Sequence, residues 1–205
     1  TATICSGGAT DIVLRSTVPS TNFAWTVSDS PAVTWTSAPA DGSRVNGNNT
    51  SIAQTLAHTA SSPTTVTYAI IPAGPAPTNC PGPEITRTVV VNPSAQVNDP
   101  ANQMHCAGTA VPALSFTTNR TGGTTTYEWL NDNTAIGLGA SGSGNLPAFT
   151  ATNSGTAPIT ATITVIPIFT NGGQSCSGTP QTFTITVNPS AQVNDPADQV
   201  QCNNA

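Results

Sequence analysis

The sequence predicts an all-β fold made of tandem antiparallel β-sandwiches. The first observation is an internal repeat, because VNPSAQVNDPA occupies residues 91–101 and occurs again unchanged at residues 187–197, 96 positions later (187 − 91). A period of that length suits one small β-sandwich and is too long for a solenoid unit. The second observation is the alternation of apolar and polar residues in short segments bounded by Gly and Pro, which is typical of strands.

The repeat also predicts the domain organisation. We expect a first repeat at 1–94, a second at 95–190 and the truncated start of a third at 191–205. The chain begins just before a cysteine and shows no signal peptide, so we interpret it as an internal piece of a longer protein.

Corresponding strands can be placed in the two repeats. The first repeat has strand patterns at 22–27 (NFAWTV), 63–72 and 85–91, and the second has them at 126–131 (TYEWLN), 158–167 and 183–187. Trp25 and Trp129 occupy the same place in these patterns and are predicted to pack between the two sheets. Arg87 stands where the second repeat has Phe183, which predicts either a wetter edge of the first core or a β-bulge.

The repeated segment is expected to form the joint between repeats. Only 92–96 separates the last strand of one repeat from a first strand expected to start near Val97, and no Gly-rich run occurs there, so the joint should be a semi-rigid spacer. Identical joints would then build a regular rod, with each repeat advancing the axis by roughly 35–45 Å. The predicted joint residues are Asn92, Pro93, Asn98, Asp99, Pro100, Asn188, Pro189, Asp195 and Pro196.

The acidic residues of the joint raise the alternative of a calcium site. Asp99 and Asp195 recur beside asparagines, and oxygen ligands at a joint could bind Ca²⁺. Each joint supplies only one or two carboxylates, whereas Ca²⁺ takes six to eight oxygens. An Asx-turn before Pro100 is the simpler interpretation, and no metal or other cofactor is predicted.

The composition of the chain excludes two classes of partner. Charged residues make up only 6%, the net charge is −5, and all four basic residues are scattered arginines. A nucleic-acid surface needs clustered Lys and Arg, so nucleic acid is not expected as a partner. No apolar run reaches the ~20 residues of a membrane helix, so membrane insertion is not expected either. The ordinary, strictly patterned apolar content argues against disorder.

The five cysteines follow the repeat. Cys5 and Cys80 occupy the first repeat, Cys106 and Cys176 occupy matching places in the second, and Cys202 opens the third. In an exported protein this pattern indicates one disulfide within each repeat, Cys5–Cys80 and Cys106–Cys176, while buried free thiols remain the alternative.

Residues able to carry catalysis are few. His58 and His105 are the only histidines, and neither has an acid and a nucleophile in a recognisable pattern. Glu84 and Glu128 fall in different repeats, so they do not form a glycosidase pair. We therefore predict no catalytic residue and no enzyme activity. A sugar platform of exposed aromatic side chains is the alternative to the predicted core role for Trp25, Trp35, Tyr127 and Trp129.

The pattern from Trp129 to Pro189 runs W–loop–SGSGNLPAFTATN–APITATITVIP–NGGQSC–GTPQTFTITVNP. It resembles the PKD-like, immunoglobulin-like repeats of giant secreted surface proteins of gliding and other Bacteroidetes, with the gliding-motility adhesins of the type 9 secretion system as the nearest type. The resemblance covers the first repeat more loosely, because an insertion at 29–49 replaces the Gly/Ser loop. It implies immunoglobulin-like sandwiches and an extracellular, cell-surface location, and it offers no catalytic residue.

The function predicted from these observations is structural. The chain is expected to belong to the shaft of a long surface adhesin or filament that spaces an adhesive tip from the cell, in gliding motility or surface attachment. Its partners would be neighbouring repeats of the same chain, with surface glycans or other cell-surface proteins as further candidates. A carbohydrate-binding module and an accessory domain of a secreted enzyme are the alternatives. The identical joints favour the shaft, since neither alternative requires fixed spacing.

Overall fold

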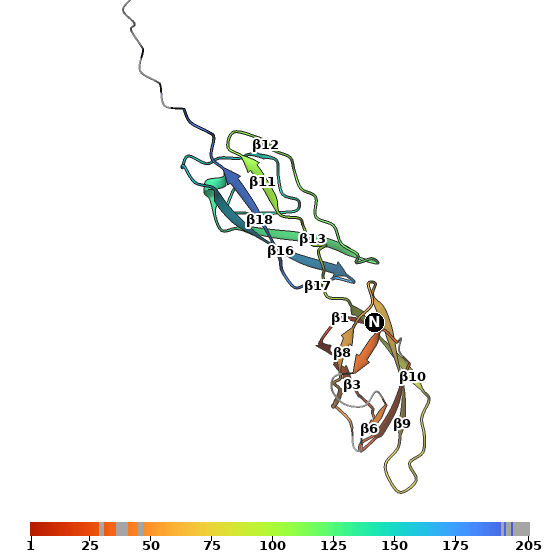
Figure 1. Cartoon of the computed structure of the whole chain (residues 1–205). Coiled ribbons are helices and arrows are strands. Elements are labelled where there is room, and N and C mark those ends of the chain that lie inside the picture. Colours follow the sequence, from red (N-terminus) through yellow and green to blue (C-terminus); the bar gives the residue numbers. More distant parts are fainter. Residues whose placement is uncertain (29–30, 36–40, 45–46, 194, 196–197, 199–205) are drawn as a thin grey trace, which may run out of the picture.

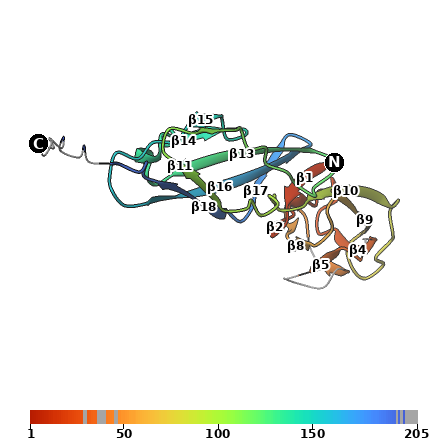
Figure 2. The ribbon, with the colours of Figure 1, turned by 45° about the horizontal axis from the view of Figure 1, so that its top comes forward.

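The computed structural model describes residues 1–28, 31–35, 41–44, 47–193, 195 and 198. They form two β-sandwiches, repeat 1 and repeat 2, which lie end to end (Figures 1 and 2). The predicted all-β class is therefore confirmed. The one helical element in the described segments is a short 3₁₀ turn, η1 (Thr134–Ile136), in repeat 2.

Repeat 1 contains one long sheet and two short ones. The long sheet has the order β1-β10-β9-β4-β6, and the short sheets pair β2-β8-β5 and β3-β7. The bounds are β1 Ala2–Cys5, β2 Gly8–Ala9, β3 Ile12–Val13, β4 Asn22–Ser28, β5 Val33–Trp35, β6 Gly42–Arg44, β7 Ser51–Ile52, β8 Thr55–His58, β9 Thr64–Ala73 and β10 Ile85–Asn92.

Repeat 2 uses the same plan. Its long sheet has the order β11-β18-β16-β13-β14 with β17 on β16, and β12 pairs with β15. The bounds are β11 Gln103–Cys106, β12 Ala110–Val111, β13 Thr124–Asn131, β14 Ser141–Ser143, β15 Phe149–Thr150, β16 Ile159–Asn171, β17 Gln174–Ser177 and β18 Gln181–Asn188. The ends of the strands predicted from apolar alternation thus differ by at most four residues from the ends of β4, β9, β10, β13, β16 and β18.

Each sandwich has its own hydrophobic core, as period-two alternation requires when one face of a strand is buried. Trp25 (7% exposed) and Trp129 (4% exposed) lie in the cores of repeats 1 and 2, as predicted. Arg87 is exposed on β10, and the pairing of β10 with β9 runs from residue 85 to residue 91 without an extra residue. Of the two alternatives for Arg87, a solvent-exposed edge of the first core is confirmed and a β-bulge is wrong.

One strand pair in each repeat is parallel. β1 pairs with β10 so that Cys5 lies opposite Asn92, and β11 pairs with β18 so that Cys106 lies opposite Asn188. The opening strand of each repeat therefore ends beside the end of its last strand, and in repeat 1 this end lies next to repeat 2.

The segment between β10 and β11 differs from the expected joint. Residues 93–102 contain no strand, so the strand expected near Val97 starts instead at Gln103. Val97 is nevertheless only 2% exposed, because its side chain packs into the core of repeat 2. Apolar burial without a ladder partner explains why the pattern there resembled a strand.

Candidate functional site: the joint between the repeats

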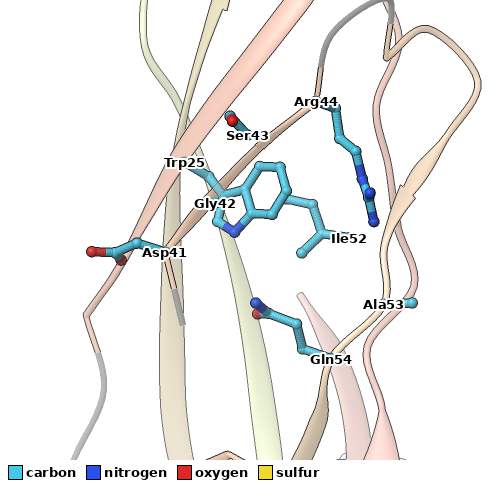
Figure 3. Close-up of a pocket in the computed structure, with 8 residues that line it drawn as sticks. All are labelled: Trp25, Asp41, Gly42, Ser43, Arg44, Ile52, Ala53 and Gln54. Carbon is cyan, nitrogen blue, oxygen red and sulfur yellow. The ribbon is translucent and has the colours of Figure 1, made fainter. Parts of the chain in front are cut away.

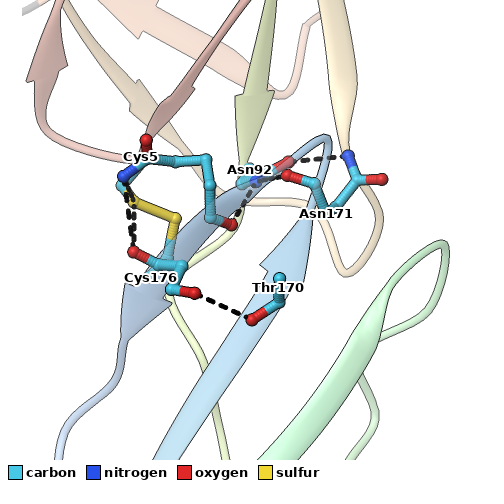
Figure 4. Close-up of a disulfide and its surroundings, with 7 residues drawn as sticks. Cys5, Asn92, Thr170, Asn171 and Cys176 are labelled. Carbon is cyan, nitrogen blue, oxygen red and sulfur yellow. Dashed lines mark hydrogen bonds between the residues drawn. A yellow bond between two sulfur atoms is a disulfide. The ribbon is translucent and has the colours of Figure 1, made fainter.

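A disulfide crosses from repeat 1 to repeat 2. It joins Cys5 at the end of β1 to Cys176 on β17, with 5.5 Å between the Cα atoms (Figure 4). Cys80 and Cys106 are free and exposed. The predicted pairs Cys5–Cys80 and Cys106–Cys176 are therefore wrong. Cys202 lies outside the described residues.

The parallel pairing of β1 explains this correction. Cys5 lies beside Asn92, the last residue of β10, whereas Cys80 precedes the first residue of that strand. Eight residues of strand at about 3.3 Å each separate the two positions by about 26 Å. A disulfide needs Cα atoms within about 7 Å, so the pair within repeat 1 cannot form. The loop between β9 and β10 indeed lies at the end of repeat 1 far from repeat 2 (Figure 1).

A pair of asparagine side chains lies beside the disulfide (Figure 4). Asn92 Nδ2 donates to the backbone oxygen of Asn171 at 3.0 Å, and Asn171 Nδ2 donates to Asn92 Oδ1 at 2.9 Å. Asn92 is fully buried, so these bonds satisfy an amide that is otherwise costly to bury. Asn171 ends β16, and the turn after it places Gly172 against the side chain of Thr3.

A second set of contacts joins the loop between β8 and β9 of repeat 1 to residues 120–122 of repeat 2. Arg120 Nη1 donates to the Ala60 carbonyl at 3.1 Å, and the Thr121 amide donates to the Ser61 carbonyl at 3.0 Å. Gly122 lies against Pro63. The joint is therefore held by hydrogen bonds at two separate places as well as by the disulfide.

The connecting segment is itself packed. Gln96 Oε1 accepts hydrogen bonds from Thr118 Oγ1 and the Asn119 amide, and Ala95 is 4% exposed. Gly178 approaches the Ala95 carbonyl so closely that a Cβ atom there would overlap it. The segment is therefore fixed to repeat 2 rather than free as a linker.

His58 is a titratable group at this joint whose pKa is shifted. It is 8% exposed, and its Nε2 lies 2.8 Å from Thr64 Oγ1. Burial, together with the Arg120 guanidinium across the joint, lowers the pKa of His58 from its ordinary value of 6.5. Protonation of His58 is thus disfavoured while the two repeats are in contact.

The acidic joint residues can be placed as follows. Asp99 is exposed, and neighbouring Asn98 donates from Nδ2 to Thr117 Oγ1 at 2.9 Å. Within the described residues no three His, Cys, Asp or Glu side chains gather where they could hold a metal ion. Asp195 is exposed, Asn188 and Pro189 are half-buried, and Pro196 lies outside the described residues.

The remaining candidates do not converge on a reaction centre. His105 Nε2 lies 3.0 Å from Gln103 Oε1 on β11, in a different repeat from His58. Glu128 lies on β13 of repeat 2, whereas Glu84 precedes β10 of repeat 1. The geometry at the joint fixes two domains against one another.

The aromatic side chains proposed as a sugar platform are mostly in the cores. Trp25, Trp129 and Tyr127 are at most 8% exposed, and Trp35 packs edge-on against Tyr68 at 6.3 Å. Beside Trp25 a cavity of about 190 Å³ is lined by Asp41, Gly42, Ser43, Arg44, Ile52, Ala53 and Gln54 (Figure 3). Small-molecule sites usually enclose about 300–1,000 Å³, so this cavity is small for a ligand.

Several residues of the joint were not predicted. Asn171 and Arg120 come from repeat 2 segments that the sequence shows only as a turn and a loop, and Ala60–Ser61 come from a loop of repeat 1. The Asn-Gly-Gly turn at 171–173 was the available signal, because it marks a tight loop that can approach another backbone.

Comparison with known proteins identifies one domain family. Residues 2–95 match the family model described as "PKD-like domain". The match falls on repeat 1, which shows the looser resemblance in the sequence. No curated protein matches the chain.

Solved structures give weak similarities. The crystal structure of human mucin-like protocadherin EC1-2 has a TM-score of 0.31 at 9% identity, covering 92% of this chain and 95% of its own. CBD12 from CALX1.2 gives 0.32 at 9% identity over 90% and 96%. Extracellular cadherin domains 3–6 of protocadherin gamma B2 give 0.29 at 11% identity over 82% of this chain and 41% of theirs.

The compartment follows from the disulfide and the domain type. Disulfides form and persist outside the cytoplasm, where thiols are not kept reduced. A PKD-like sandwich covalently joined to a second sandwich is accordingly typical of extracellular repeat proteins. We assign the chain to an extracytoplasmic protein. No described helix is long and apolar enough to cross a membrane.

Proposed function

We propose that these repeats are part of the shaft of a long secreted cell-surface adhesin or filament, which spaces an adhesive tip from the cell. The observation that carries this proposal is the joint. The Cys5–Cys176 disulfide, the Asn92–Asn171 pair and the Arg120–Ala60 contact fix the orientation of one sandwich on the next. A shaft must resist bending, whereas independent binding modules gain nothing from a covalently fixed orientation.

Fixed joints of identical sequence determine the shape of a longer array. If every joint imposes one rotation and one translation, successive sandwiches build a rod with a regular twist. Strands of this length with their end loops advance the axis by roughly 35–45 Å per repeat. The sparse charge, 6% of residues, leaves a largely neutral surface rich in Thr and Ser on such a rod.

The resemblance of the repeats supplies the setting of this proposal. We place the shaft on a surface protein of the Bacteroidetes gliding-adhesin type, exported by the type 9 secretion system and acting in gliding motility or surface attachment. Its partners are neighbouring repeats of the same chain, and surface glycans or other cell-surface proteins at the tip. We propose no enzymatic activity, no cofactor, no nucleic-acid binding and no membrane insertion for this segment.

A carbohydrate-binding module is the second candidate, with an accessory domain of a secreted enzyme as its variant. The cavity beside Trp25 favours it, because an indole edge, Arg44 and Gln54 could contact a sugar. Its small volume and the burial of Trp25 favour the shaft. Binding on a glycan array that Arg44→Ala abolishes would support the module instead.

Small-angle X-ray scattering tests the shaft. Longer arrays can be made by continuing the chain from Ala197 with copies of residues 102–197, because residues 95–101 and 191–197 are identical. The maximum dimension should grow by about 35–45 Å with each added repeat while the cross-section stays constant. A compact particle, or an ensemble of bent shapes, would contradict the proposal.

A further inference from the structure

The same sequence occupies two different environments in this structure. At the joint Val97 is 2% exposed, whereas Val193, its copy at the far end of repeat 2, is 90% exposed. Other residues of the repeated segment differ in the same direction: Asn92, Pro93 and Ala95 are buried, whereas Asn188 and Pro189 are half-buried and Ala191 is exposed. Because the residues are identical, the difference comes from the neighbouring sandwich, which covers only the first copy.

The strand that carries Cys106 repeats the geometry of the strand that carries Cys5. Cys106 lies opposite Asn188 in parallel register, as Cys5 lies opposite Asn92. The following amide donates to the asparagine carbonyl in both repeats, at 2.8 Å from Ser6 and 2.9 Å from Ala107. The thiol of Cys106 is therefore presented in the way that Cys5 is presented to Cys176.

Met104 lies two residues before Cys106 on the same strand, β11. It occupies the place of Thr3, which contacts Gly172 of the following sandwich, and it is 70% exposed. Because Thr3 lies in the joint, Met104 occupies the position in repeat 2 that a following sandwich would contact. The surface formed by Met104, Cys106, Asn188, Pro189, Ala191 and Val193 is called the open end of repeat 2 below.

A hollow adjoins the open end. It has a volume of about 520 Å³ and is lined by residues 153–156 and 189–192. Residues 155–156 correspond to Ala60 and Ser61, because Pro158 and Pro63 occupy matching places before β16 and β9. At the existing joint Ala60 and Ser61 accept hydrogen bonds from Arg120 and Thr121. In a longer array, the hollow would therefore receive the loop of a following repeat that corresponds to residues 120–122.

The opposite end of the chain presents the complementary thiol. Pro81 pairs with Ala73, the last residue of β9. In repeat 2, Ser177 pairs in the same way with Ile168 on β16. The next glycine donates to the matching proline carbonyl in both repeats, Gly82 to Pro72 at 2.8 Å and Gly178 to Pro167 at 3.0 Å. Cys80, directly before Pro81, is therefore the structural counterpart of Cys176, and it is exposed.

We propose that Cys106 and Cys80 are the two halves of further inter-repeat disulfides of the Cys5–Cys176 kind. Cys106 would pair with the Cys176 counterpart of a following PKD-like repeat docked on the open end. Cys80 would pair with the Cys5 counterpart of a preceding one. This inference rests on the tandem array of the proposed function. It adds that neighbouring repeats are linked covalently, with one disulfide across every joint.

The reaction is a two-electron oxidation. Two thiols lose two protons and two electrons and form one S–S bond, while an oxidised low-molecular-weight disulfide such as glutathione disulfide is reduced to two thiols. Docking precedes the bond, since the two sulfurs must first come within the short Cα separation that a disulfide allows.

The test is an extended chain that continues from Ala197 with one copy of residues 102–197. In the added copy, Cys106→Ser removes a competing thiol, and Ser177→Thr changes the mass of the peptide that contains the added Cys176. After refolding with glutathione disulfide, mass spectrometry of non-reduced peptides should show Cys5 linked to the original Cys176 and Cys106 linked to the added one. Cys80 should be recovered without a link to any other cysteine of the chain.

The matched control is Cys106→Ser in the original repeat 2, which should leave the added Cys176 without a link to any cysteine of the chain and should not change the Cys5–Cys176 link. Cys106 linked to the Cys176 of its own repeat, or Cys106 and the added Cys176 both recovered without a link to any cysteine of the chain, would overturn the proposal. Scattering of the same sample separates the two hypotheses. A straight rod with unlinked thiols contradicts only the proposed inter-repeat disulfides. A linked but flexible array contradicts the proposed function as a shaft.

Discussion

Asn92 and Asn171 exchange hydrogen bonds across the joint, at 3.0 and 2.9 Å, and Asn92 is fully buried when they do so. The joint therefore depends on a buried polar pair as well as on the disulfide. A buried amide that loses its partner carries its full desolvation penalty, so this pair also selects one orientation of the two repeats.

Replacing Asn92 with alanine should destabilise the contact between the repeats. Asn92→Ala removes both bonds and leaves the Asn171 side chain without its acceptor, which should cost about 1–3 kcal/mol in urea-induced unfolding. Asn188→Ala is the matched control, because Asn188 has the same place in repeat 2 but no sandwich covers it there. Equal losses in the two variants would show that the asparagine acts within its own repeat.

The disulfide pattern can be measured directly on this chain. Cys5 and Cys176 should be recovered as one linked peptide, whereas Cys80 and Cys106 should be alkylated without reduction. Cys176→Ser should lower the unfolding free energy by up to about 5 kcal/mol in the chain-entropy model for a loop of 171 residues. Cys80→Ser is the control and should leave stability unchanged. Recovery of a Cys5–Cys80 peptide would contradict the structure.

The cysteines also show which features of the fold can be predicted from sequence and which cannot. The strands, the repeat and the two core tryptophans follow from local patterns, since alternation and turn residues act within a few positions. The partner of Cys5 depends on β1 lying parallel to β10, which no local pattern specifies. The matching spacing of the cysteines is equally compatible with pairs within repeats and with pairs between neighbouring repeats, and only the topology decides between them.

The joint should weaken in mild acid. Burial and Arg120 lower the pKa of His58 in the folded state. The folded protein therefore binds a proton less readily than the unfolded chain, and stability is full above about pH 6.5 and falls as the pH drops below it. The urea midpoint should decrease between pH 7.5 and pH 5.

Three variants test the assignment of that pH dependence to His58. His58→Gln should remove most of it, because the titrating group is gone. His105→Gln, which leaves His58 in place, should keep it. Arg120→Gln should reduce it in part, since the cation opposing protonation is absent while burial remains. A pH profile unchanged by His58→Gln would show that other groups are responsible.

The glycine beside each core tryptophan should be intolerant of a side chain. A Cβ atom on Gly142 would overlap the indole of Trp129, and one on Gly42 would lie 2.5 Å from Cζ2 of Trp25. Gly142→Ala should therefore destabilise repeat 2 by about 1–3 kcal/mol through overpacking. Gly139→Ala is the control, since nothing lies within 4 Å of a Cβ atom there. Thermal unfolding of both variants measures the difference.

The last prediction concerns the contact between Gly178 and the connecting segment. A Cβ atom on Gly178 would overlap the backbone of Ala95, which cannot move aside as a flexible side chain could. At the corresponding Gly82 of repeat 1, the added atom would lie 3.1 Å from the Pro72 ring and 3.7 Å from the Pro72 carbonyl oxygen, without overlapping the backbone. Gly178→Ala should therefore displace the two repeats relative to one another, and Gly82→Ala should not.

The displacement has two separate readouts. In Gly178→Ala the scattering profile should change at low angle while circular dichroism keeps its β-sheet signature, because each sandwich retains its own core. The Cys5–Cys176 bond should also be reduced faster by dithiothreitol, since a shifted joint exposes the sulfur atoms to attack. Scattering and reduction rates identical to those of the Gly82→Ala control would mean that the joint absorbs the added methyl group and is less rigid than a shaft requires.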